Sequence, residues 1–113
     1  MSYDIDIGDE EYNYTSNVGE MYHKHIEHNG ITGVQCLDGL TGKQAGDVLK
    51  HAFDNILWEV LDYWHRDTVG EPQFCKLYDS PNGWGSTVGG LLFLAQVMAG
   101  CYANPRCKVR VSA

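Results

Sequence analysis

Two short polar segments of the sequence carry side-chain amides, hydroxyls and aromatic rings in front of predicted helices. They span residues 12–17 (YNYTSN) and 81–86 (PNGWGS). Helix N-termini attract anions through free backbone N–H groups and the positive end of the helix dipole. Aromatic rings there can stack on a flat base, and glycines let a ligand approach the backbone. The predicted ligand-binding residues are Tyr12, Asn13, Tyr14, Thr15, Asn17, Asn82, Gly83, Trp84 and Gly85.

A third predicted helix start, Thr41-Gly42-Lys43, adds Lys43 as a candidate counter-charge for an anion, although it lacks the full phosphate-loop pattern. The same segments have an ordinary structural explanation. Asn, Thr and Ser before a helix act as N-caps, and Asn-Gly favours a turn. The binding hypothesis therefore requires the starts of the first and third helices to open onto one pocket.

Other reactive residues do not form a recognisable catalytic or metal-binding pattern. His23 and Glu27 are spaced to share a helix face, but no third metal ligand has a diagnostic spacing. The four cysteines contain no C-x-x-C pair and are expected to stay thiols. The sequence predicts no catalytic residue, metal site or cofactor. A small hydrolase stays open as an alternative, because catalytic groups can converge in space from distant positions.

The charge distribution argues against nucleic acid as a direct partner. The net charge is −7, with five carboxylates and no base in residues 1–11, whereas a phosphate backbone requires a coherent basic face. The start shows no signal-peptide pattern, and the longest strongly apolar stretch, Leu91–Ala99, is too short to cross a bilayer. The sequence therefore predicts no membrane association and a cytoplasmic location.

Alternating residues at the two ends of the chain predict a small sheet. Residues 3–7 place Tyr3, Ile5 and Ile7 on one face and acids on the other, and residues 108–112 place valines inward and bases outward. Pairing these strands would set acids beside bases, which is a favourable cross-strand arrangement. The direction of the pairing stays open.

Three helices are expected between these strands, in one domain spanning residues 1–113 of class α+β. The first begins near Ser16 or Asn17 and ends at Asn29-Gly30. The second follows a capping box of Thr41 and Gln44 and runs to Trp64 on one buried apolar stripe that includes Leu57 and Leu61, with Trp58 and Tyr63 off the stripe. A long irregular connection, residues 67–85, leads to the third.

The third helix runs from after Ser86 to about Tyr102 and is apolar over most of its girth, so it is expected to be central. Its buried stripe is predicted to be Val88, Leu91, Leu92, Ala95, Ala99 and Tyr102. Gly89, Gly90 and Gly100 cost helix propensity and are predicted to mark close backbone approach.

Four stretches of the sequence together resemble a family of small proteins encoded by bacteriophages and prophages: MSYDIDIG, YNYTSNVGEMY, LDGLTGKQA and the end PNGWG…VRVS. The resemblance implies a phage setting and a host cytoplasmic location. It supplies no activity, because the family's function is not settled.

Two binding functions follow from these observations. The first hypothesis is a phage accessory protein that sequesters a small anionic, nucleotide-like ligand. The alternative is a protein–protein inhibitor of a host defence complex, whose acidic face engages a basic surface. A homo-oligomer is also expected, because Trp58 and Tyr63 lie off the apolar stripe.

Overall fold

The structure is a computed structural model that describes residues 2–67 and 77–112, and the side chains of residues 2–62 and 77–112 within them. The strands (β), α-helices (α) and 3₁₀ helices (η) follow one another along the chain as β1 (Ser2–Ile7), β2 (Glu10–Thr15), η1 (Ser16–Val18), α1 (Gly19–His25), β3 (Glu27–His28), β4 (Ile31–Thr32), η2 (Val34–Leu37), α2 (Gly42–Asp67), α3 (Thr87–Ala103) and β5 (Val109–Ser112). The predicted α+β class, with three helices and a small sheet that contains both end strands, is confirmed.

The sheet has three antiparallel strands in the order β2-β1-β5. The predicted pairing of the two ends of the chain is confirmed, and its direction is antiparallel, with Asp6 opposite Arg110. The sequence prediction missed β2, which forms a hairpin with β1 through the two-residue turn Gly8-Asp9. Gly8 has φ +59°, which is typical of the first position of a type II′ turn.

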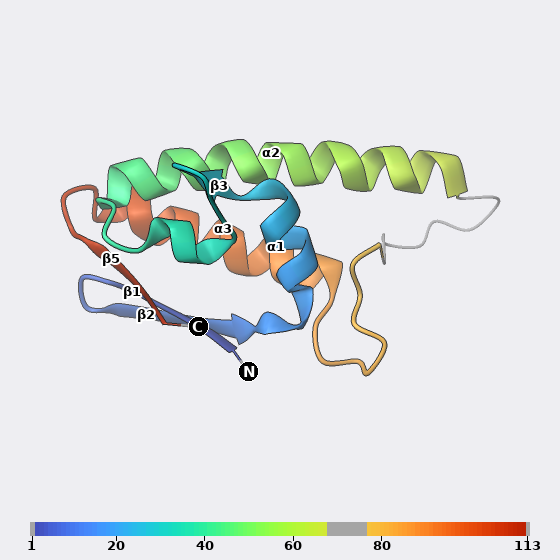
Figure 1. Cartoon of the computed structure of the whole chain (residues 1–113), viewed down its shortest axis with the longest axis horizontal. Helices are drawn as coiled ribbons and strands as arrows, with labels where there is room; N and C mark the ends of the chain where they lie inside the picture. The colour runs from blue at the N-terminus through green and yellow to red at the C-terminus, as the bar shows by residue number, and fades with distance from the viewer. Residues whose placement is uncertain (1, 68–76, 113) are drawn as a thin grey trace.

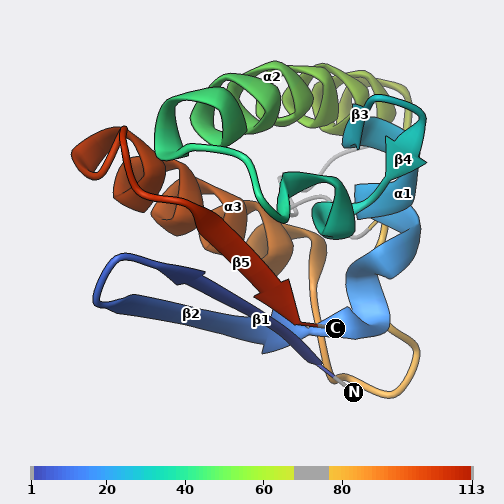
Figure 2. The same ribbon diagram turned by 60° about the vertical axis from the view of Figure 1, so that its left-hand side comes forward.

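Helix α3 lies between the sheet and α2, so the molecule has three layers (Figure 1). Helix α1 and η2 close the remaining side, as the turned view shows (Figure 2). All three layers contribute to the core. Its fully buried large side chains are Ile5, Ile7, Val18, Met21, Tyr22, Ile26, Val34, Leu37, Leu49, Ile56, Leu94 and Val97.

Helix α2 begins as predicted. The Gln44 N–H donates to Thr41 Oγ1 at 3.3 Å and the Thr41 N–H donates to Gln44 Oε1 at 3.0 Å, which is a capping box. The 26-residue helix is about 39 Å long, so its later turns extend beyond the sheet (Figure 1). Leu57 and Leu61, predicted to be buried, are therefore 36% and 49% exposed. Trp58 is exposed as predicted, whereas the side chains of Tyr63 and Trp64 lie outside the described residues.

The first predicted helix was too long. It ends at His25, and Asn29-Gly30 forms the turn of the short β3–β4 hairpin instead of a helix terminus. Both turn residues have positive φ, +53° and +80°, as a type I′ turn requires. The prediction failed because Asn-Gly marks both helix ends and hairpin turns.

Helix α3 has the predicted bounds but a different buried face. Its interior residues are Thr87, Gly90, Phe93, Leu94, Val97, Gly100 and Cys101, whereas Leu92 and Tyr102 are exposed. The predicted close approach at the glycines is confirmed. A Cβ at Gly89 would overlap the Tyr14 hydroxyl, and one at Gly100 would overlap the Tyr12 hydroxyl. The two tyrosines of β2 thus explain why α3 carries glycine there.

Candidate functional site

The two polar segments predicted to form a ligand site do meet in space. The Asn17 side-chain amide donates to the Trp84 carbonyl oxygen at 2.8 Å. Gly85 has φ +126°, and a Cβ there would lie 2.8 Å from the Thr15 Cγ2 atom. The end of β2 and the segment before α3 therefore pack directly against each other.

Within this junction, Tyr12 and Tyr14 pack against α3. Residues 10–15 form an edge strand, not a loop, so alternate side chains turn toward α3. The Tyr14 ring stacks on Phe93 at a centroid distance of 5.6 Å, and its hydroxyl accepts a hydrogen bond from the Ser86 N–H at 3.1 Å. Asn13 points to the opposite face and donates to Asp4 Oδ1 at 2.6 Å. These three side chains hold the strand in place.

The remaining polar groups of the junction bond to one another. Asn82 Oδ1 accepts from the Trp84 N–H at 2.9 Å and from the Ser80 hydroxyl at 2.6 Å. Thr15 Oγ1 accepts from the Asn17 N–H at 3.3 Å. Gly83 has φ +78° in the turn that these bonds close. The amides predicted to bind an anion thus build the loop.

The start of α3 is also capped from within the chain. Ser86 Oγ accepts from the Gly89 N–H at 2.9 Å, and Asp79 Oδ1 accepts from the Thr87 N–H at 2.8 Å. A carboxylate at this helix end takes the place that an anionic ligand would occupy. Trp84 is the exposed aromatic ring of the junction, with 74% of its surface accessible.

Lys43 is not brought to this junction. It lies in the first turn of α2, at the end of the molecule away from the segment 77–86 (Figure 1). There its ammonium group pairs with Asp47 at 3.1 Å, and its backbone N–H donates to the Pro105 carbonyl oxygen. Lys43 therefore supplies no counter-charge beside Trp84.

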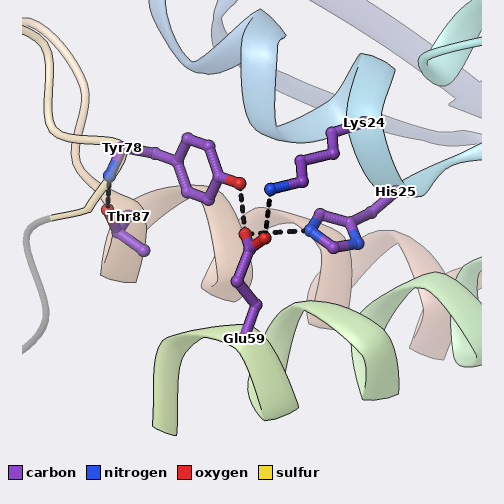
Figure 3. Close-up of polar contacts among 5 residues, drawn as sticks. All are labelled: Lys24, His25, Glu59, Tyr78 and Thr87. Atoms are coloured by element: carbon purple, nitrogen blue, oxygen red, sulfur yellow. Dashed lines mark hydrogen bonds and ion pairs between the residues drawn. The ribbon is translucent and has the colours of Figure 1, made fainter. Parts of the chain in front are cut away.

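A second polar cluster, which the sequence did not reveal, surrounds the Glu59 carboxylate of α2 (Figure 3). Lys24 and His25, from the end of α1, reach it from one side, and Tyr78 reaches it from the other. The His25 Nε2 atom lies 3.0 Å from Glu59 Oε1, and the side chains of His25 and Glu59 are only 12% and 22% exposed. The Tyr78 N–H in turn donates to Thr87 Oγ1 at 2.7 Å, which ties the cluster to α3.

The electrostatics of this Glu59 cluster favour a structural role over acid–base catalysis. Burial alone would raise the pKa of the Glu59 carboxyl, but hydrogen bonds from Lys24, Tyr78 and His25 outweigh it and lower that pKa to about 2. Burial and the Glu59 carboxylate raise the pKa of Tyr78 to about 12. A general acid or base works best with a pKa near neutrality. Both pKa values move away from neutrality, so at neutral pH Glu59 stays ionised and Tyr78 stays protonated.

The predicted histidine and glutamate pair on α1 is not formed. His23 Nδ1 lies 2.9 Å from Thr32 Oγ1, while Glu27 falls beyond the helix and accepts from the Gly30 N–H. Among the described side chains, those of residues 2–62 and 77–112, no group of three or more His, Cys, Asp or Glu is placed to hold a metal ion. Cys36 and Cys101 are buried thiols and Cys107 is half-buried, while Cys75 lies outside the described residues.

The solvent face of the sheet carries most of its acidic side chains. The strand register places Asp6 between Glu11 and Arg110, and Asp4 between Asn13 and Ser112. We call this surface, made by Asp4, Asp6 and Glu11, the acidic face. Asp9 extends it in the turn of the hairpin, whereas Glu10, opposite the buried Ile7, alternates to the α3 side. Arg110 lies opposite Asp6 on the acidic face, and Lys108 alternates to the same side of the chain as Arg110.

Comparisons with protein-family models, with curated proteins and with solved structures find no match to this chain. Among the residues that the structure describes, none of the helices is long and apolar enough to span a membrane. The function is therefore inferred from the geometry of the surface.

Proposed function

We propose that this protein is a non-enzymatic binding protein that engages a basic surface of a partner protein with its acidic face. The observation that carries the proposal is the strand register, which sets Asp4, Asp6 and Glu11 on one side of the sheet, where Arg110 is the base opposite Asp6. Opposite potentials steer association and fix the orientation of a complex. The net charge of −7 acts in the same direction at longer range.

The anionic-ligand hypothesis stays a prediction, and the geometry gives it less support. An anion beside Trp84 would meet the Asp79 carboxylate at the start of α3, and it would have to displace the internal bonds of Asn17 and Asn82. Like charges at short range raise the free energy of such a complex. A basic partner meets no such obstacle on the acidic face.

In the phage setting that the sequence resemblance implies, the partner is a host defence protein. Binding to a basic surface of that protein would block it by occupying the surface, and no catalysed reaction would be needed. The complex would weaken as salt rises, because charges on an exposed face are screened over about 10 Å at 0.1 M salt.

The test compares two double variants with the same net charge of −5. Asp6→Asn with Glu11→Gln removes two carboxylates from the acidic face, and Glu20→Gln with Asp54→Asn removes two exposed carboxylates from the helices. Each protein is immobilised and used to capture proteins from a bacterial lysate at low and high salt. The proposal predicts a discrete set of basic proteins that the wild type and the helix variant retain and the acidic-face variant loses.

Equal loss of these proteins from both double variants would show that only total charge matters and would contradict the proposal. Capture that persists at high salt with the acidic-face variant would contradict it as well.

A further inference from the structure

The two edge strands of the sheet, β5 and β2, differ in whether the chain itself bonds to their outward backbone groups. On the β5 edge, the Val109 N–H donates to the Leu40 carbonyl oxygen at 2.8 Å and the Val111 N–H donates to Asp38 Oδ1 at 2.9 Å. Residues 38–40 of the same chain therefore cover the β5 edge. At the opposite edge, β2 is the last strand in the sheet order, as Figure 2 shows.

The hairpin turn decides which backbone groups of β2 face outward. Gly8-Asp9 is a two-residue turn, so Ile7 and Glu10 form the first hydrogen-bonded pair of the hairpin. Hydrogen-bonded and non-bonded pairs alternate, which directs the N–H and C=O groups of Tyr12 and Tyr14 toward β1. The backbone groups of Glu11 and Asn13 consequently point away from the sheet, and no described residue bonds to them there.

An exposed ring stands at the far end of this edge. Asn17 holds the Trp84 carbonyl oxygen at 2.8 Å, and Gly85 packs against Thr15, the last residue of β2. Trp84 is 74% exposed at this place. A strand that paired with β2 would therefore meet free backbone groups along its length and an aromatic ring at its end.

The acidic residues beside the β2 edge indicate which kind of strand could pair with it. Glu10 and Glu11 lie on β2 itself, Asp9 lies in the turn, and Asp4 and Asp6 lie on the neighbouring strand. A second copy pairing through β2 would bring two such acidic hairpins together, and like charges across a strand pair are destabilising. A segment that carries lysine or arginine at alternate positions would instead set its bases beside these carboxylates.

We infer that a partner adds an extended, basic segment as a fourth strand along β2, between the Gly8-Asp9 turn and Trp84. Main-chain hydrogen bonds to Glu11 and Asn13 supply the pairing, and the acidic face supplies the preference for basic side chains. This inference rests on the proposed function and specifies how the basic partner is held.

The test separates backbone pairing from charge attraction with two variants at one position. Asn13→Pro removes an outward N–H, and proline is tolerated on an edge strand when its missing N–H faces solvent. Asn13→Ala loses the same side-chain bond to Asp4 but keeps the N–H. Circular dichroism and thermal melting establish that both variants are folded.

The probe is a ten-residue peptide of alternating lysine and valine, with binding measured by fluorescence anisotropy at low salt. We expect Asn13→Ala to bind within threefold of the wild type and Asn13→Pro to bind at least tenfold more weakly. In the wild type, amide hydrogen exchange followed by NMR should slow at Glu11 and Asn13 when the peptide is added. The exchange result stands even if the proline variant does not fold.

Each other outcome overturns the inference in a distinguishable way. Equal binding by the two Asn13 variants, with unchanged exchange at Glu11 and Asn13, would show that charge alone attracts the peptide, and the proposed function would survive. Absence of peptide binding to the wild type, or equal binding of a glutamate–valine peptide, would reject a basic strand. Concentration-dependent dimers that Asn13→Pro abolishes would assign the edge to a second copy.

Discussion

The Asn17 side-chain amide donates a hydrogen bond of 2.8 Å to the Trp84 carbonyl oxygen, across 67 positions of the sequence. This bond joins the end of the β1–β2 hairpin to the segment before α3. It fixes the exposed Trp84 ring at the end of the β2 edge. The two segments thus form one surface, whose polar groups bond to one another.

Removing the Asn17 amide should loosen this junction. We expect Asn17→Ala to lower the free energy of unfolding by about 1 kcal/mol, because one hydrogen bond is lost and the Trp84 carbonyl is exposed to water. Urea unfolding followed by circular dichroism measures the change. Asn55→Ala, at an exposed position of α2, is the control and should be neutral or slightly stabilising. A neutral Asn17→Ala would show that the bond does not hold the segment.

Gly100→Ala should destabilise the protein even though alanine favours helix. The added Cβ would overlap the Tyr12 hydroxyl, and overpacking of this kind costs about 1–3 kcal/mol. Thermal melting measures the loss, and Tyr12→Phe in the same chain should recover part of it. Gly46→Ala is a matched helical control, since its nearest neighbour is the exposed Tyr102 ring, which can move. A larger loss from Gly46→Ala would contradict the account.

The Glu59 cluster should make stability depend on pH in the acid range. The folded-state pKa of Glu59 is about 2, below its ordinary value of 4.5, so the stabilisation is present above pH 4.5 and is lost as the pH falls toward 2. At neutral pH we expect Glu59→Gln to cost about 1–3 kcal/mol, as hydrogen bonds to a charged group typically do. The difference from the wild type should shrink as urea unfolding is repeated at lower pH.

Glu20→Gln, at an exposed position of α1, is the control for removing a carboxylate at neutral pH and should change the free energy of unfolding by less than about 0.5 kcal/mol. A constant difference between Glu59→Gln and the wild type from pH 7 to pH 2 would mean that packing, not charge, accounts for the loss. At the alkaline end, the raised pKa of Tyr78 predicts a further loss of stability as the pH rises from 10 toward 12.

The cysteines should differ in reactivity. Burial raises the pKa of both Cys36 and Cys101 to about 11, so little thiolate forms at neutral pH. Cys107 is only half-buried. Among these three cysteines, alkylation with iodoacetamide, read by peptide mass spectrometry, should label Cys107 first and reach Cys36 and Cys101 only when the protein unfolds. Early labelling of Cys36 or Cys101 in the folded protein would contradict their placement in the core.

Local sequence signals predicted the elements that depend on local interactions. Helix α2 was predictable because its apolar spacing and its Thr41–Gln44 capping box act within a few residues of each other. Strand β2 was missed because its alternating tyrosines stand among polar residues that also suit a loop before a helix. Residues 10–15 form a strand because Tyr12 and Tyr14 pack against Gly100 and Gly89 of α3, a contact between distant parts of the sequence.

The buried face of α3 could not be chosen from sequence, because apolar residues surround the helix and tertiary packing selects among them. The Glu59 cluster was invisible for another reason. Lys24, Glu59 and Tyr78 come from three separate parts of the chain, and only the packing of α1 against α2 brings them together. The ligand hypothesis required the starts of the first and third helices to open onto one pocket. The two segments meet through Asn17 and Trp84, and the shared pocket stays a prediction.

The most direct measurement of the proposed function is zero-length carbodiimide cross-linking of the protein to the basic proteins that it captures. The reagent joins carboxylates to lysines that are in contact, so mass spectrometry of the products identifies which carboxylates lie in the interface. The account predicts links from Asp4, Asp6 and Glu11 to partner lysines. Links that arise instead from Glu20 and Asp54, with none from the sheet, would contradict it.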